Sequence, residues 1–209
     1  MRYLVVRFGS MAVSLLLLGV FTLISAQSPV DGIDARANTA ELAKQLGSPD
    51  ALLRQRSAEA LARLAAKDQR KIVEGYRLQE KNKEVRVALD WALYRMGKSE
   101  ALFRVVSELD SGRHEQAIGY LSELESPEML YPYLKQANNP PRINAGLLKA
   151  LGRIGNTESL DIIKPYREST QPFVAEAAEL AHDEIEKRLS QETPTTRVRP
   201  RTVDKPEYR

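Results

Sequence analysis

The chain has 209 residues, with 43% hydrophobic and 28% charged side chains, which is ordinary usage for one globular domain with short appendages. It contains no cysteine, which excludes disulfides, thiolate zinc sites and cysteine nucleophiles. The formal net charge is +3, but residues 27–190 carry 24 basic and 25 acidic groups, so the basic excess lies at the two ends. A near-neutral body argues against a nucleic-acid partner.

The N-terminus has the layout of a secretory signal peptide. Arg2 and Arg7 precede an apolar stretch that ends in the small residues Ser25 and Ala26, so we expect residues 1–26 to be removed before Gln27. An uncleaved inner-membrane anchor is the alternative, because the stretch from Phe8 to Ala26 is just long enough to span a bilayer. The sequence thus predicts an exported, periplasmic or secreted protein, with residues 27–37 as a linker.

The body repeats itself at steps of 28 to 32 residues. Five segments align, and they start at Leu53, Val85, Arg113, Ile143 and Val174. The start itself and the fourth, seventh, eighth and eleventh places after it lie on one stripe of a helix and are mostly apolar or alanine. Amphipathic partner helices are predicted between them, at residues 67–78, 100–109, 127–136 and 157–167.

Local signals set the predicted helix ends. Asn38 begins a segment that resembles a capping box, and Ser48 and Ser126 precede prolines as helix caps do. Gly97 and Gly155 stand where helices should stop. We therefore expect an all-α protein of about ten helices in antiparallel pairs that form a curved stack. A helical bundle without regular stacking is the alternative.

These units resemble HEAT repeats, in the short variety also seen in phycobilisome lyase subunits. The resemblance is carried by VRVALDWALYRMGKSEAL from Val85 and INAGLLKALGRIGNTESL from Ile143, and it covers residues 38–190. It implies an α-solenoid of about five helix-turn-helix units and says little about activity. The fifth unit, where His182 replaces an apolar residue, is expected to be a polar-faced terminal cap.

The sequence offers little for catalysis. It contains no glycine-rich phosphate loop and no G-x-S-x-G elbow. His114 is expected to face solvent near a helix start, and His182 to lie on the core stripe with Asp183 pointing elsewhere. We therefore expect no catalytic residue, no metal and no cofactor.

One group of side chains suits recognition of a partner protein. The second, sixth and ninth places should point away from the core, and in the second unit they are Val87, Trp91 and Tyr94. Aromatic residues are enriched in interface hot spots, so these three are candidate anchors. Packing of Trp91 into the core is the alternative.

A column of arginines stands beside these aromatics. Arg63, Arg95 and Arg153 share the tenth place, so they are predicted to form a basic stripe that orients an acidic partner. Weak surface ion pairs are the other interpretation of this column.

Residues 191–209 contain three prolines and few large apolar groups, and are expected to be a disordered tail. Its basic arm of Arg197, Arg199 and Arg201 could touch an anionic surface, or simply be solvated.

The functional prediction is a non-enzymatic scaffold or adaptor in the bacterial envelope, which binds another protein on its helical face. An enzyme or accessory subunit that acts on an envelope substrate is one alternative. A membrane-anchored structural protein with an uncleaved N-terminus is the other.

Overall fold

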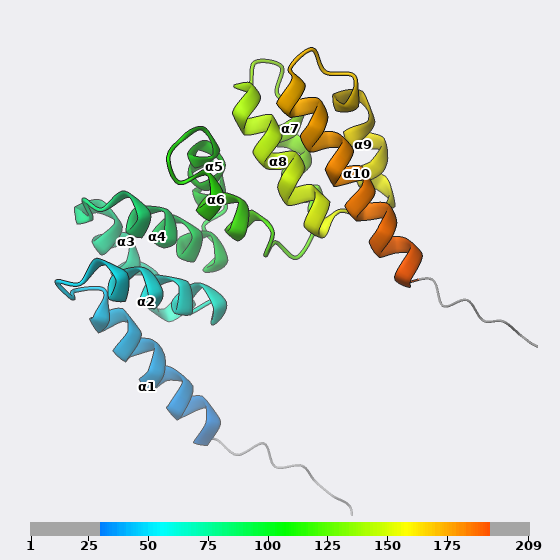
Figure 1. Cartoon of the computed structure of the whole chain (residues 1–209). Coiled ribbons are helices and arrows are strands. Elements are labelled where there is room, and N and C mark those ends of the chain that lie inside the picture. Colours follow the sequence, from blue (N-terminus) through cyan, green and yellow to red (C-terminus); the bar gives the residue numbers. More distant parts are fainter. Residues whose placement is uncertain (1–29, 193–209) are drawn as a thin grey trace, which may run out of the picture.

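The computed structural model describes residues 30–192 and the side chains of residues 38–191, and this part of the chain is entirely helical (Figure 1). It holds ten α-helices and three short 3-10 helices and no strand, which confirms the all-α prediction. None of the helices within residues 30–192 combines the length and the apolar character needed to cross a bilayer. The predicted signal peptide at residues 1–26 and the arginines of the tail lie outside the described residues.

The helices follow the predicted segments closely. The first part of the described chain contains α1 (Val30–Gln45), α2 (Ala51–Arg63), η1 (Lys67–Gln69), α3 (Arg70–Gln79), α4 (Lys83–Arg95), α5 (Ala101–Ser107), η2 (Glu108–Asp110) and α6 (His114–Leu121). The second part of the described chain contains η3 (Pro127–Leu130), α7 (Tyr131–Leu134), α8 (Pro141–Ile154), α9 (Thr157–Arg167) and α10 (Pro172–Glu192). Each of the five aligned segments therefore falls on one helix: α2, α4, α6, α8 or α10.

Polar caps and one left-handed glycine fix several helix ends. Asn82 begins α4 by accepting a hydrogen bond from the Val85 N–H, and Asn156 begins α9 with a full capping box. Gly97 follows α4 at φ 93°, a conformation that glycine adopts at low cost. Gly97 is the helix stop that the sequence predicts, whereas the two asparagine caps are found in the structure.

Two predicted starts are wrong. Asn38 lies inside α1, which already begins at Val30, so the expected linker over 27–37 is partly helical. Asp50, rather than Ser48, caps α2, because the Asp50 side chain accepts a hydrogen bond from the Leu52 N–H. Ser48 instead accepts a hydrogen bond from the Asp50 N–H, one turn before the helix.

The helices of the aligned segments pack in a row. α2 lies against α4, α4 against α6, α6 against α8, and α8 against α10, while α3, α5 and α9 pack beside them (Figure 1). Small residues at the contacts allow close approach: Ala58, Ala62, Ala88, Ala92, Ala150 and Ala178 are fully buried. A Cβ placed on Gly152 would approach the Cα of Ala181 to 3.1 Å, so α8 and α10 touch almost backbone to backbone.

Ion pairs join the helices α2 to α5 in the N-terminal half of the described chain. Arg54 of α2 donates two hydrogen bonds, of 2.7 and 3.0 Å, to the Glu80 carboxylate after α3. The buried carboxylate of Asp90 accepts from Arg77 at 2.8 Å and from Arg104 at 3.2 Å, which links α3, α4 and α5. Charged groups that are this well paired fix the relative position of the helices.

Candidate functional site: the Trp91 hollow

Trp91 and Val87 are buried, which corrects their assignment as outward-facing anchors and agrees with the alternative that Trp91 packs into the core. Only 2% of Trp91 and 1% of Val87 is accessible, and Tyr94 is half-buried. The physical reason is the position of α4, which has α2 on one side, α6 on the other and α3 and α5 behind it. A helix surrounded in this way buries side chains on nearly its whole circumference.

The three aromatic rings form one stack. The Trp91 ring lies 5.5 Å from that of Tyr94 and 5.6 Å from that of Tyr120, to which it is almost parallel. The guanidinium of Arg95 lies 5.7 Å from the centre of the Trp91 ring, within the range of a cation–π contact. Trp91 thus joins α4 to α6 and forms the floor of a surface hollow.

A chain of hydrogen bonds closes that floor. The hydroxyl of Tyr120 donates to Oε1 of Glu59 on α2 at 2.7 Å and accepts from Nε2 of Gln116 at 2.8 Å. Burial and the bond to Glu59 both raise the pKa of Tyr120, so the phenol stays protonated and acts as a hydrogen-bond donor. The group therefore positions Glu59 and is no general base.

We call the resulting depression the Trp91 hollow. Its volume is about 250 Å³, and its lining comes from Glu59, Arg63, Trp91, Gln116, Gly119, Tyr120 and Glu123. Arg63 at the end of α2 and Glu123 in the turn after α6 add exposed charges to this lining. An aromatic floor with polar groups at its edge resembles the core and rim of a protein interface.

A second hollow of about 460 Å³ opens next to it, at the C-terminal ends of α2 and α4. We call it the loop-edge hollow. Its lining includes Tyr94, Arg95, Lys67 and the half-exposed Met129. Nη2 of Arg95 lies 3.5 Å from the Glu125 carboxylate. Arg95 therefore stands between the two hollows.

The predicted arginine stripe is only partly assembled. Arg63 lines the Trp91 hollow, and Arg95 lies over the Trp91 ring. Arg153 is exposed on α8, and the whole of α6 lies between α4 and α8 in the row. The structure thus brings two of the three arginines to the site and leaves Arg153 outside it.

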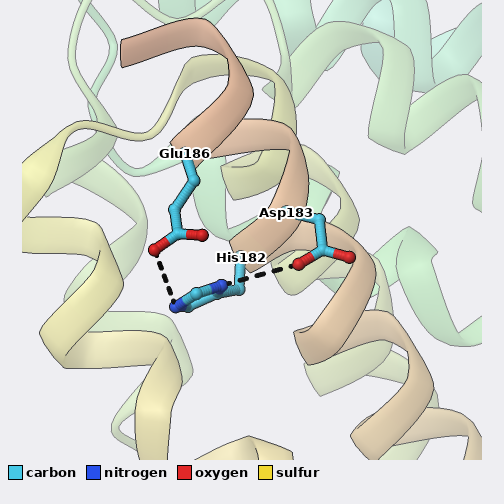
Figure 2. Close-up of side chains that lie close together, drawn as sticks. All are labelled: His182, Asp183 and Glu186. Atoms are coloured by element: carbon cyan, nitrogen blue, oxygen red, sulfur yellow. Dashed lines mark ion pairs between the residues drawn. The ribbon is translucent and has the colours of Figure 1, made fainter. Parts of the chain in front are cut away.

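The histidines lie elsewhere. Nδ1 of His114 donates toward the Leu109 carbonyl at 2.6 Å, so this half-buried side chain holds the start of α6 and does not face solvent freely. His182 lies between two carboxylates on α10: its Nδ1 is 3.7 Å from Asp183 and its Nε2 is 3.7 Å from Glu186 (Figure 2). The prediction that Asp183 points away from the ring is therefore wrong.

This trio could hold a metal ion only weakly. One possible ligand atom from each side chain lies within 4.8 Å of the others, but Asp183 and Glu186 are exposed. Each ring nitrogen of His182 faces a different carboxylate, Nδ1 that of Asp183 and Nε2 that of Glu186 (Figure 2). Structural zinc sites normally take four protein ligands.

Sequence reasoning missed most of the polar part of the hollow. The seventh place of the third segment puts Tyr120 on the core stripe, and periodicity does not connect its hydroxyl with Glu59, which is 61 residues away in the chain. Periodicity places both residues on neighbouring helices but does not predict how far a side chain reaches across a third helix. Comparison of the chain with protein-family models gives no match, and comparison with curated protein sequences gives none either.

Proposed function

We propose that this protein is a non-enzymatic scaffold or adaptor that binds another protein on the face formed by α2, α4 and α6. We further propose that residues 38–190 form an α-solenoid of about five HEAT-like repeats, and that the protein is exported to the bacterial envelope. The basic arm of the tail would then add a weak contact with an anionic surface.

The order of contacts supports the solenoid. Each helix of the aligned segments packs on the next one of the series, and the steps between the segments are nearly equal. In a solenoid each unit contacts only its neighbours, and one helix of every unit contributes to a continuous face.

The Trp91 hollow is the observation that carries the binding function. Its floor is a rigid aromatic stack whose polar atoms are already paired, as in the Tyr120–Glu59 hydrogen bond. The exposed charges of Arg63 and Glu123 remain at the rim. A rigid floor lowers the entropic cost of binding, while rim charges add specificity.

Site-specific photo-crosslinking in envelope extract tests this function. A photoreactive phenylalanine analogue is placed at Arg63 or at Glu123, both on the hollow, in the chain from residue 27 to 209. We expect both positions to crosslink the same discrete protein. The charge reversals Arg63→Glu and Glu123→Arg, at exposed positions, should weaken capture while the circular dichroism spectrum is unchanged.

The matched control places the same analogue at Phe103, which is 57% exposed on α5 and lines neither hollow. This position should not crosslink that protein. Equal products from Phe103 and from the two hollow positions, or no discrete product at the hollow, would remove this face from the proposal.

A further inference from the structure

A surface groove runs along the contact between α8 and α10 at the C-terminal end of the row. Its volume is about 470 Å³. α8 contributes Arg142, Ala145 and Lys149 to the lining, and α10 contributes Phe173, Glu176 and Leu180. Phe173 is 45% and Leu180 is 54% exposed, so two large apolar side chains face solvent on the same side of one helix.

The two walls of this groove are equivalent places of neighbouring units. α8 and α10 run in the same direction, and the alignment of Ile143 with Val174 pairs Arg142 with Phe173 and Lys149 with Leu180 (Figure 1). On each helix the outer two residues are seven positions apart, about 10.5 Å along the axis. Ala145 on one wall and Glu176 on the other stand between them.

The chemistry of the two walls is complementary although their geometry is the same. The α8 wall carries a cation, an alanine and a cation, while the α10 wall carries an apolar group, a carboxylate and an apolar group. An α10 wall laid on an α8 wall would put Glu176 over the small Ala145. Its carboxylate would then lie between the cations of Arg142 and Lys149.

Of the charges of Arg142, Lys149 and Glu176, two have no partner among the described side chains and one is weakly paired. Within residues 38–191, neither Arg142 nor Glu176 makes a hydrogen bond or an ion pair. The ammonium of Lys149 lies 3.9 Å from the carboxylate of the exposed Glu115. A surface ion pair at this distance contributes little to stability. The half-buried His114 also lines this groove, and Glu115 reaches Lys149 from α6.

We propose that this groove is a dimer interface occupied by a second copy of the chain. The two-fold axis runs parallel to α8 and α10, so each α10 wall covers the α8 wall of the other copy. The guanidinium of Arg142 then stacks on the Phe173 ring of the second copy, and the stem of Lys149 covers its Leu180. Every contact occurs twice, as an isologous interface requires.

This interface is independent of the proposed scaffold function. Arg63 and Glu123 of the Trp91 hollow do not line the groove, so loss of the dimer and loss of partner capture are separate results.

The test is the molar mass of the full mature chain, measured by light scattering and by sedimentation over a series of concentrations. We expect the wild type to reach twice the chain mass. Glu176→Arg places three cations together, and Leu180→Glu puts a charge on the apolar wall. Each should weaken the dimer at least about tenfold. Lys164→Glu, an exposed charge reversal on α9, is the matched control and should leave the dimer intact.

A charge swap distinguishes this pairing from general surface effects. The triple variant Glu176→Arg, Arg142→Glu, Lys149→Glu restores opposite charges across the interface and should recover the dimer that Glu176→Arg alone loses. Circular dichroism confirms that each variant is folded. A wild type that is monomeric at every concentration, or a triple variant no better than the single one, would overturn the proposal.

Discussion

Trp91 is the side chain with the largest volume in the core, and it joins two neighbouring units. Replacement by alanine would leave a cavity between α4 and α6 and remove the surface on which Tyr120 stacks. We expect Trp91→Ala to lower the free energy of unfolding by about 4 kcal/mol. Urea unfolding followed by circular dichroism measures this loss.

A matched variant separates this packing role from binding at the rim. Arg63→Ala removes an exposed side chain of the same hollow and should change the free energy of unfolding by less than about 0.5 kcal/mol. If Trp91→Ala were as stable as Arg63→Ala, the aromatic stack would not be part of the core.

The Arg54–Glu80 pair predicts how acid affects the fold. The hydrogen bonds from Arg54 lower the pKa of the Glu80 carboxyl below its ordinary value of 4.5. A group whose pKa is lower in the folded state stabilises the fold fully above its unfolded value, and this contribution is lost as the pH falls through the folded pKa. Stability from this pair should therefore be present at pH 7 and decline below pH 4.5.

Glu80→Gln isolates this contribution. The amide cannot form the charged bonds with Arg54, so the variant should lose about 2 kcal/mol at pH 7. The difference between wild type and variant should shrink as the pH falls from about 5 to about 2. Chemical unfolding at several pH values measures it, and a difference that stays constant with pH would contradict the role of the Glu80 charge.

At the scale of elements, Arg188 closes the contact between α8 and α10. Its guanidinium donates to the main-chain carbonyls of Gly152 and Arg153 at 2.9 and 2.8 Å, and also to that of Gly155. These carbonyls belong to the end of α8, where helical acceptors lack partners of their own. One side chain of α10 thus caps the C-terminus of α8.

Removal of this cap should loosen both helices. We expect Arg188→Ala to lower the free energy of unfolding by about 2 kcal/mol, because three main-chain acceptors lose a charged donor. Thermal and urea unfolding of the full chain measure the loss. Lys187→Ala, which removes the exposed cation next to it, is the control and should be nearly neutral. Equal losses of unfolding free energy in the two variants would show that the effect comes from removing a positive charge and not from losing the cap.

The helices themselves were largely predictable. Apolar spacing located α9 at residues 157–167 and placed each aligned segment on a helix, because burial on one stripe is a local pattern. The start of the row was predicted incorrectly at Asn38, since a cap motif inside a helix looks the same in sequence as one at its start.

The candidate site was less predictable for a physical reason. The outward direction assigned to Trp91 assumes that each helix has one covered face, but α4 is covered on several sides. The hydrogen bond between Tyr120 and Glu59 crosses from α6 to α2 over α4, and no periodic pattern in sequence encodes such a reach. Sequence therefore identified the helix and left open whether Trp91 is exposed or packed, and the structure shows it packed.

The described helices form a row, with α2 near one end and α10 at the other (Figure 1). α2 and α4 lie in one half and α8 and α10 in the other, with the short α6 between them (Figure 1). Most contacts join neighbouring helices, and the hydrogen bond between Tyr120 and Glu59 is an exception that links α6 to α2. A local destabilisation should therefore affect the adjacent helices most and fade with distance along the row. In a globular bundle, by contrast, most mutations lower the stability of all helices together.

Ile185→Ala tests this difference. Ile185 is fully buried on α10, and its side chain packs against Gly155 at the end of α8. Its truncation should cost about 3 kcal/mol locally. In native-state hydrogen exchange we therefore expect faster exchange in α8, α9 and α10, and unchanged exchange in α2 and α4.

The matched variant acts at the other end of the row. Val73 is fully buried on α3, so Val73→Ala should speed exchange in α3 and in α4, which packs against it, and leave α8 and α10 unchanged. A uniform increase over all helices in either variant would mean that the chain unfolds as one cooperative unit. The contrasting pattern requires stability to be set by nearest neighbours, which is the physical property that defines a stack of repeats.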